Sequence, residues 1–224
     1  MPDFAEQRKR MVQRYRRSGY IRTEAMAEAM LRVPREAFMG SAYVDYAYSD
    51  QPFPIPGDGR QTISAPYMYP VFYEPLEVKP GQRLLEVGAG SGYGAALARE
   101  LVGPTGLVVS IEINPTTYRF AEANLLQTGY DDVLLVLGDG SPGYPKEAPY
   151  DAICVTAACP EIPRPLVEQL SAPGRLMAPV GAASSLLGQD LVLLEKDMTG
   201  RLQRRALMKV AYVPLIGRYG WIRR

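Results

Sequence analysis

A glycine-rich segment between a predicted strand and a predicted helix holds the residues whose spacing is most typical of a chemical site. Gly88, Gly90 and Gly92 stand at alternate positions there, and glycine lets a backbone turn tightly and approach a ligand closely. Glu86 stands two residues before the first of these glycines, where a carboxylate can meet a cationic ligand. Glu112 ends the next predicted strand, where an acidic side chain typically accepts hydrogen bonds from ribose hydroxyls. The pattern therefore predicts a nucleotide pocket.

The glycine pattern is compatible with more than one ligand. Residues 90–95 also satisfy the G-x-G-x-x-A form of a dinucleotide site, so a nicotinamide or flavin enzyme and a purely structural turn stay open as alternatives. Three acidic positions favour S-adenosylmethionine. Glu86 would repel a pyrophosphate, and Asp139 follows the third strand within a Gly-Asp-Gly turn, where it can accept from an adenine amino group. Asp151 begins the fourth strand.

The composition restricts the chemistry further. The 224 residues include no histidine, which removes the Ser-His and Cys-His pairs and the commonest metal ligand, and we expect no metal site. The only cysteines, Cys154 and Cys159, lie in or just after an apolar run, and we expect both to be core residues. Hydrophobic residues make up 47%, enough for a sizeable core, while the formal net charge of +1 provides no global attraction for nucleic acid.

The chain also shows no sign of membrane insertion or secretion. It has no apolar stretch long enough to span a bilayer, and its first residues contain no apolar signal core. We therefore expect a cytoplasmic protein with no membrane partner and no nucleic-acid partner.

A regular alternation of strands and helices begins at Arg83 and must position these residues. Strands are predicted at 84–87, 106–111, 133–137, 152–155, 175–180, 190–194 and within 203–213, with helices at 93–101, 116–127 and around 166–170. Such alternation is typical of parallel βαβ units in a doubly wound, Rossmann-like α/β sheet. Combined with the acidic positions that favour S-adenosylmethionine, it leads us to expect a methyltransferase fold. Ligands of such sheets bind at the carboxyl ends of the strands, near the topological switch point.

The first part of the chain has a different character. Residues 4–17 predict a basic helix, and Thr23 is a suitable N-cap for a second helix. Residues 40–80 are rich in Pro, Gly and Tyr, so we expect mostly irregular surface loops that carry binding groups. The whole chain is expected to form one methyltransferase domain, with helices and substrate-side loops in 1–80 and the cofactor-binding α/β core in 81–224.

Ordered blocks along the chain resemble the protein-L-isoaspartate (D-aspartate) O-methyltransferase family. The block Gln-Thr-Ile-Ser-Ala-Pro-Tyr-Met at residues 61–68 precedes the glycine loop. Other blocks that look like the family's stand at 33–38, 48–55, 138–140, 150–153, 156–158, 161–163, 173–176, 179–181 and 213–215. The resemblance covers roughly residues 11 to 217. Each block is weak alone, but their ordered combination is specific.

This resemblance implies a reaction and a set of site residues. It implies methyl transfer from S-adenosylmethionine to the α-carboxylate of L-isoaspartyl residues in damaged proteins and peptides. Ser64 takes the position of the family's active-site serine. Together with Glu86 from the spacing above, the expected cofactor-binding residues are Thr62, Ile63, Ser64, Ala65, Gly88, Gly90, Gly92, Glu112, Asp139 and Gly140. We expect a monomer.

The expected reaction needs no strong base. An isoaspartyl α-carboxylate is ionised at neutral pH and is already a nucleophile, so the protein chiefly has to align it with the methyl–sulfur bond. We therefore expect Ser64 to orient this carboxylate by donating a hydrogen bond, not to attack covalently. The alternative is a serine that only stabilises its own turn.

Some positions depart from the commonest family pattern and leave substrate choice open. These are Tyr67, the pair Tyr69-Pro70, and Ser141. The tail at 217–221 is expected either to cap the cleft or to be structural. Two other functions stay open: a related methyltransferase acting on a tRNA base or a modified peptide carboxylate, and a non-catalytic nucleotide-binding protein.

Overall fold

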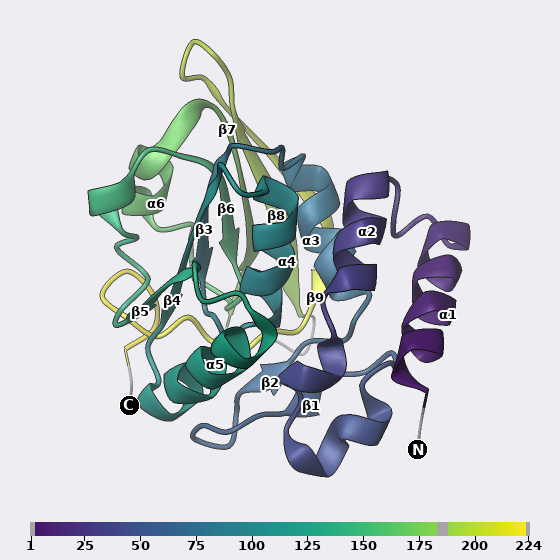
Figure 1. Cartoon of the computed structure of the whole chain (residues 1–224). Coiled ribbons are helices and arrows are strands. Elements are labelled where there is room, and N and C mark those ends of the chain that lie inside the picture. The colour runs from purple at the N-terminus through teal and green to yellow at the C-terminus, as the bar shows by residue number, and fades with distance from the viewer. Residues whose placement is uncertain (1–2, 183–187, 223–224) are drawn as a thin grey trace.

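A seven-stranded sheet forms the centre of the molecule in the computed structural model, which describes residues 3–182 and 188–222 (Figure 1). The strand order is β5-β4-β3-β6-β7-β8-β9. Their bounds are β3 (Arg83–Val87), β4 (Leu107–Glu112), β5 (Leu134–Leu137), β6 (Tyr150–Val155), β7 (Leu170–Val180), β8 (Gln189–Lys196) and β9 (Leu202–Val210). A separate short hairpin pairs β1 (Phe53–Pro54) with β2 (Thr62–Ile63).

Helices cover both faces of the sheet. Their bounds are α1 (Phe4–Arg17), α2 (Glu24–Arg32), α3 (Met68–Leu76), α4 (Tyr93–Val102), α5 (Pro115–Thr128) and α6 (Arg164–Gln169). One apolar cluster joins α1, α2, α3 and α4 to one face, and a second cluster on the other face includes Leu166 of α6 and Leu215 (Figure 1). Within the described residues, no helix is both long and apolar enough to cross a membrane.

The parallel part of the sheet places three strand ends side by side. The register pairs Val87 of β3 with Ile111 of β4 on one side and with Val155 of β6 on the other. The chain moves outward from β3 to β4 and β5 and then returns to β6 on the opposite side of β3. This reversal is a topological switch point, and it leaves a crevice at the carboxyl ends where a ligand can bind.

Local signals set where the helices begin. The side-chain oxygen of Asn114 accepts hydrogen bonds from the backbone N–H groups of Thr116 and Thr117, which fixes the start of α5 directly after β4. Thr23 is confirmed as the N-cap of α2, because its hydroxyl accepts from the Met26 N–H. The same segment is attached to α3 because the buried Glu74 accepts hydrogen bonds from the Thr23 N–H and hydroxyl.

The predicted Rossmann-like fold is confirmed, and one edge of its sheet is antiparallel. Strand β8 runs antiparallel to β7, and β9 runs antiparallel to β8. The β8–β9 connection is a short turn in which Asp197 Oδ1 accepts hydrogen bonds from the N–H groups of Thr199 and Arg201. So short a turn has no room for a crossover helix, and therefore a hairpin forms.

Two elements differ from their sequence assignment. The segment predicted as irregular contains α3. Its Pro70 falls in the first turn, where proline is tolerated, and its Pro75 lies inside the helix one residue before the end. The helix placed around 166–170 ends at Gln169, and Leu170 already begins β7. Both cysteines are buried, as expected of core residues.

Candidate functional site

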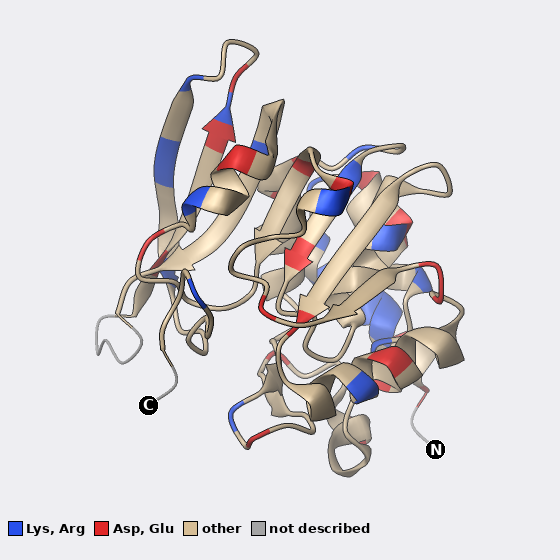
Figure 2. Cartoon of the chain, turned by 90° about the vertical axis from the view of Figure 1, so that its left-hand side faces the viewer, with Lys and Arg blue, Asp and Glu red and all other residues tan. Residues whose placement is uncertain are grey.

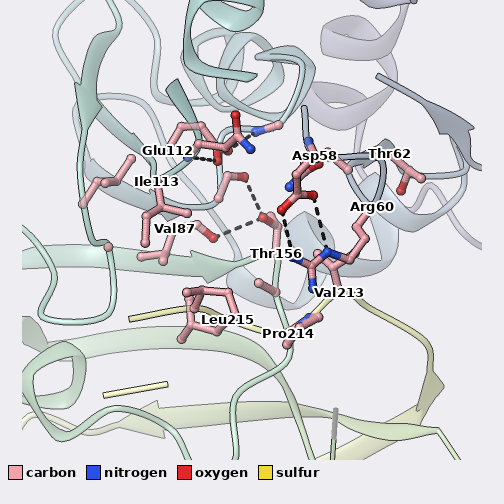
Figure 3. A pocket seen from close by; sticks show the side chains of 18 residues that line it. Asp58, Arg60, Thr62, Val87, Glu112, Ile113, Thr156, Val213, Pro214 and Leu215 are labelled. Atoms are coloured by element: carbon pink, nitrogen blue, oxygen red, sulfur yellow. Dashed lines mark hydrogen bonds and ion pairs between the residues drawn. The ribbon is translucent and has the colours of Figure 1, made fainter. Parts of the chain in front are cut away.

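Two pockets meet at the carboxyl edge of β3, β4 and β6. The outer pocket has an empty volume of about 810 Å³ and is drawn in Figure 3, and the inner pocket has about 490 Å³. Both are lined by Thr62, Gly88, Gly90 and Thr156. An open cleft also reaches Thr62 and Thr156 from the solvent side. The three spaces therefore adjoin one another at Thr62 and Thr156.

The first glycine of the loop packs closely against the end of β6 because it has no side chain. Gly88 has a φ of 101°, and a Cβ there would lie 2.3 Å from Thr156 Oγ1. The Thr156 hydroxyl donates to the Gly88 carbonyl at 2.6 Å, so the two strand ends are tied together at this point. Gly90 lines both pockets, whereas Gly92 lines neither and acts as the N-cap of α4 with a φ of 86°. Any residue other than glycine at position 88 would have to displace this contact.

Glu112 holds the loop from the neighbouring strand. Its Oε2 accepts from the Gly90 N–H at 3.0 Å, and its Oε1 accepts from the Asn114 N–H at 2.9 Å. Burial raises the pKa of this carboxyl, and the backbone N–H groups oppose that shift. Glu112 also lines the outer pocket, where a carboxylate keeps free lone pairs for a further donor.

Glu86 lies deeper, in the inner pocket rather than the outer one. Its side chain is buried, and its Oε2 accepts from the Ser110 hydroxyl at 2.6 Å. Burial raises the pKa of Glu86 to about 8. A cation that enters the inner pocket would favour the ionised carboxylate, because opposite charges at short range lower a carboxyl pKa.

Asp139 is engaged with the C-terminal tail. Its Oδ1 accepts from the Ser141 N–H at 2.8 Å, and its Oδ2 accepts from the Arg218 N–H at 2.7 Å. The neighbouring Gly140 lines the outer pocket. Trp221 Nε1 donates to the Ala158 carbonyl at 3.1 Å, which fixes the end of the same tail. The tail thus secures the wall formed by residues 213–216.

Ser64 lies where the inner pocket meets the open cleft and lines both. Its carbonyl accepts a 2.7 Å hydrogen bond from Nη2 of Arg35, a fully buried arginine whose Nε donates to the Ala47 carbonyl. Tyr212 lines the same two spaces. Burial raises the pKa of its phenol well above the usual value, and a side-chain hydrogen bond with Ser64 opposes that shift. A protonated phenol therefore stands beside the Ser64 hydroxyl.

The other residues expected around Ser64 line different parts of the site: the outer pocket, the inner pocket or the open cleft. Thr62 lines both pockets and the cleft, and Ile63 lines the inner pocket. Ala65 is buried and lines only the cleft. Antiparallel pairing of Ile63 with Phe53 fixes this segment against the first strand of the hairpin.

Several lining residues were missed by the sequence reasoning. Thr156 directly follows β6 next to the switch point, so the strand-end rule would have identified it. No comparable signal marks Asp58 and Arg60, which lie on the loop between β1 and β2 and form an ion pair of 2.9 Å at the outer pocket (Figure 3). Asp151 does not support a ligand, because it lies at the amino end of β6 and accepts from the Arg83 N–H.

Comparisons with known proteins agree on one family. A sequence model of the family described as Protein-L-isoaspartate(D-aspartate) O-methyltransferase matches residues 6–220. The chain is 49% identical over 219 residues to a protein-L-isoaspartate O-methyltransferase of Methanopyrus kandleri, covering 97% of this chain and 95% of the relative. It is 46% identical over 219 residues to the protein of the same name from Pyrococcus horikoshii, covering 98% and 97%.

Solved structures show the same likeness. A protein-L-isoaspartate O-methyltransferase superposes with a TM-score of 0.85 at 30% identity, covering 95% of this chain and 67% of that one. A putative protein-L-isoaspartate O-methyltransferase from Plasmodium falciparum, in complex with S-adenosyl-L-homocysteine, has a TM-score of 0.79 at 24% identity and covers 93% and 97%. The family model spans nearly the whole chain, and the two archaeal relatives match along nearly their full length. The chain therefore belongs to the protein-L-isoaspartate (D-aspartate) O-methyltransferase family.

Proposed function

We propose that this chain is a repair enzyme that transfers the methyl group of S-adenosylmethionine to the α-carboxylate of L-isoaspartyl residues in damaged proteins and peptides. One observation carries the proposal beyond family membership. The outer pocket, built on the glycine loop and Glu112, adjoins the open cleft at Thr62 and Thr156, and Ser64 lies beside that junction. A bound cofactor and a peptide entering from solvent can therefore meet at one place.

The residues present suit a nucleoside with a cationic amino-acid arm. The outer pocket combines apolar walls with the Glu112 carboxylate and the bare backbone of Gly88, Gly90 and Gly140, which is typical of a small-ligand site. Glu112 would hold the ribose hydroxyls, and Glu86 would face the cationic arm in the inner pocket. The cofactor supplies a methyl group already activated on a sulfonium.

The remaining cofactor contacts follow the positions of the loops. Thr62, Ile63, Ser64 and Ala65 would border the cofactor on the substrate side, and Gly92 would keep α4 and the glycine loop in place. Asp139 would reach the adenine through the lone pairs that its two backbone hydrogen bonds leave free. These contacts come from two places: the β1–β2 hairpin and the residue pair that follows it, and the loops at the ends of the central strands.

The chain's own contribution to the reaction is to align the acceptor. The isoaspartyl carboxylate enters ionised, so neither a base nor a covalent intermediate is needed. The Ser64 hydroxyl and the neighbouring Tyr212 phenol both can donate to it, because the raised pKa of Tyr212 keeps that phenol protonated. Arg35 fixes the backbone of Ser64 from behind. Alignment of this kind supplies several kcal/mol, up to roughly 7–11 in ideal cases.

A related enzyme that methylates a tRNA base is the second candidate, and the charge distribution counts against it. Figure 2 shows Lys and Arg interleaved with Asp and Glu over the ribbon, and the net charge is +1. We therefore propose no nucleic-acid or membrane partner. One chain lines both pockets and the cleft, so a monomer suffices. Two buried free thiols suit a cytoplasmic location.

A methyl-transfer assay with two matched peptides tests the proposal. One peptide contains a single L-isoaspartyl residue and the other a normal aspartyl residue at the same position, with labelled S-adenosylmethionine as donor. We expect transfer to the isoaspartyl peptide and little to its twin. Equal transfer to both peptides, or transfer only to tRNA, would contradict the proposed substrate.

A further inference from the structure

The open cleft that leads to Ser64 carries charge of one sign. Its empty volume is about 1670 Å³, and Arg60 and Lys209 are the only charged side chains among the described residues that line it. Arg60 comes from the loop between β1 and β2, and Lys209 comes from the end of β9, the outermost strand of the sheet. A peptide that approaches Ser64 through this cleft therefore passes two cations.

Each of these cations is exposed enough to change partners. Arg60 Nη2 lies 2.9 Å from Asp58 Oδ2, and the Lys209 ammonium lies 2.8 Å from Asp190 Oδ1. The side chains of Arg60 and Lys209 are 58% and 61% exposed. Ion pairs this exposed are weak, because water screens both charges. A carboxylate on an incoming peptide can thus contact Lys209 at little cost. It can also contact the exposed guanidinium of Arg60, which at the same time holds Asp58 through Nε and Nη2.

We propose that Arg60 and Lys209 form a subsite that selects isoaspartyl peptides with additional acidic side chains close to the isoaspartyl residue. The inference rests on the proposed function, since it assumes that the isoaspartyl carboxylate occupies the place beside Ser64. Flanking residues of the same peptide then lie in the cleft, within the range of about 10 Å over which charges act at moderate ionic strength. Acidic flanks are attracted there, and basic flanks are repelled.

Three isoaspartyl peptides test the subsite in the wild-type chain. They differ only in the residues beside the isoaspartyl position, which are alanine, glutamate or lysine. At low ionic strength we expect kcat/KM for the glutamate peptide to exceed that for the alanine peptide by about three- to tenfold, with the lysine peptide the poorest. The differences should shrink as salt is added, because the charges are exposed.

Substitutions assign the preference to the two cations. Lys209→Gln and Arg60→Gln should each lower the ratio of kcat/KM between the glutamate and alanine peptides, and Lys209→Glu should shift the preference toward the lysine peptide. Lys209 gives the cleaner test, because Arg60 also lines the outer pocket. Arg164→Gln is the matched control: it removes one cation that is 89% exposed on α6, outside the cleft, and should keep the wild-type ratio.

The possible results separate the subsite from the underlying function. Equal kcat/KM for the three peptides at low salt would overturn the subsite but leave the isoaspartyl activity standing. A wild-type ratio in the double variant Arg60→Gln with Lys209→Gln would overturn it as well. If none of the three peptides is methylated, the proposed function fails and the inference fails with it.

Discussion

The cofactor side and the substrate side of the site are built in different ways. On the cofactor side, Glu112 and the glycine loop stand at the ends of neighbouring parallel strands, where sheet register fixes their positions. On the substrate side, Arg60 and Ser64 come from the β1–β2 segment, and Tyr212 follows β9. All three line the same cleft, although β8 and β9 form a separate antiparallel hairpin. The comparison suggests that binding of the cofactor is set by the sheet and that the choice of substrate is set by the loops.

Glu112→Ala should have the largest effect and should act on cofactor binding. The substitution removes the proposed ribose contact and also leaves the Gly90 and Asn114 N–H groups unmet. The unmet N–H groups destabilise the free and the bound protein alike, so the loss of affinity comes from the ribose hydroxyls. Two lost hydrogen bonds at about 1–3 kcal/mol each should lower affinity for S-adenosylhomocysteine by roughly a hundredfold or more. Calorimetry measures this affinity. Asp139→Ala is the comparison, and this variant should lose less affinity for S-adenosylhomocysteine. Normal affinity in a folded Glu112→Ala protein would show that the sheet edge does not hold the ligand.

Ser64→Ala should act on the substrate side alone. Its backbone contact with Arg35 survives, so the fold and S-adenosylhomocysteine binding should stay close to those of the wild type. Turnover of an isoaspartyl peptide should drop by about tenfold to a few hundredfold, because the carboxylate loses an orienting donor. Steady-state kinetics with calorimetry on the same variant separate the two effects. Full activity would remove Ser64 from the site, whereas a trapped enzyme-bound intermediate would indicate covalent catalysis.

Tyr212→Phe should have a smaller effect in the same direction. The phenol is a second donor beside Ser64, and the ring packs 5.5 Å from Phe72, a contact that phenylalanine retains. We expect turnover to fall by about three- to tenfold, with thermal stability nearly unchanged, since one neutral hydrogen bond is worth about 1 kcal/mol. A rate equal to that of wild type would restrict the orienting role to Ser64.

Glu86 should give a signal of another kind, a pH dependence of stability and not a change in rate. Its pKa rises from 4.5 to about 8 on folding, so between these values the folded state holds a proton that the unfolded state has lost. Stability of the cofactor-free protein should therefore decrease as pH rises from about 5 to 8. Glu86→Gln should flatten the melting temperature over this window relative to wild type. Parallel curves for the two proteins would show that Glu86 ionises normally.

The same division explains what the sequence could predict. Buried apolar runs mark β3 and β4, and the strand-end rule then locates Gly88 and Glu112 without any knowledge of long-range packing. Ser64 required a family resemblance, because nothing local distinguishes it from a serine in a turn. Arg60 and Tyr212 could not be paired with it, since their proximity depends on the antiparallel β8–β9 hairpin, whose pairing no local pattern revealed.

Repair itself can be followed through the fate of an isoaspartyl peptide over time. The peptide is incubated with the chain and S-adenosylmethionine, and its isoaspartyl and aspartyl forms are separated by chromatography. We expect that the methyl ester appears first, that it closes to the cyclic imide with loss of methanol, and that the imide opens partly to the normal aspartyl peptide. Formation of the ester, the imide and the aspartyl peptide from the isoaspartyl peptide should each depend on the methyl donor. An isoaspartyl peptide that persists unmethylated beside active donor and folded protein would contradict the account.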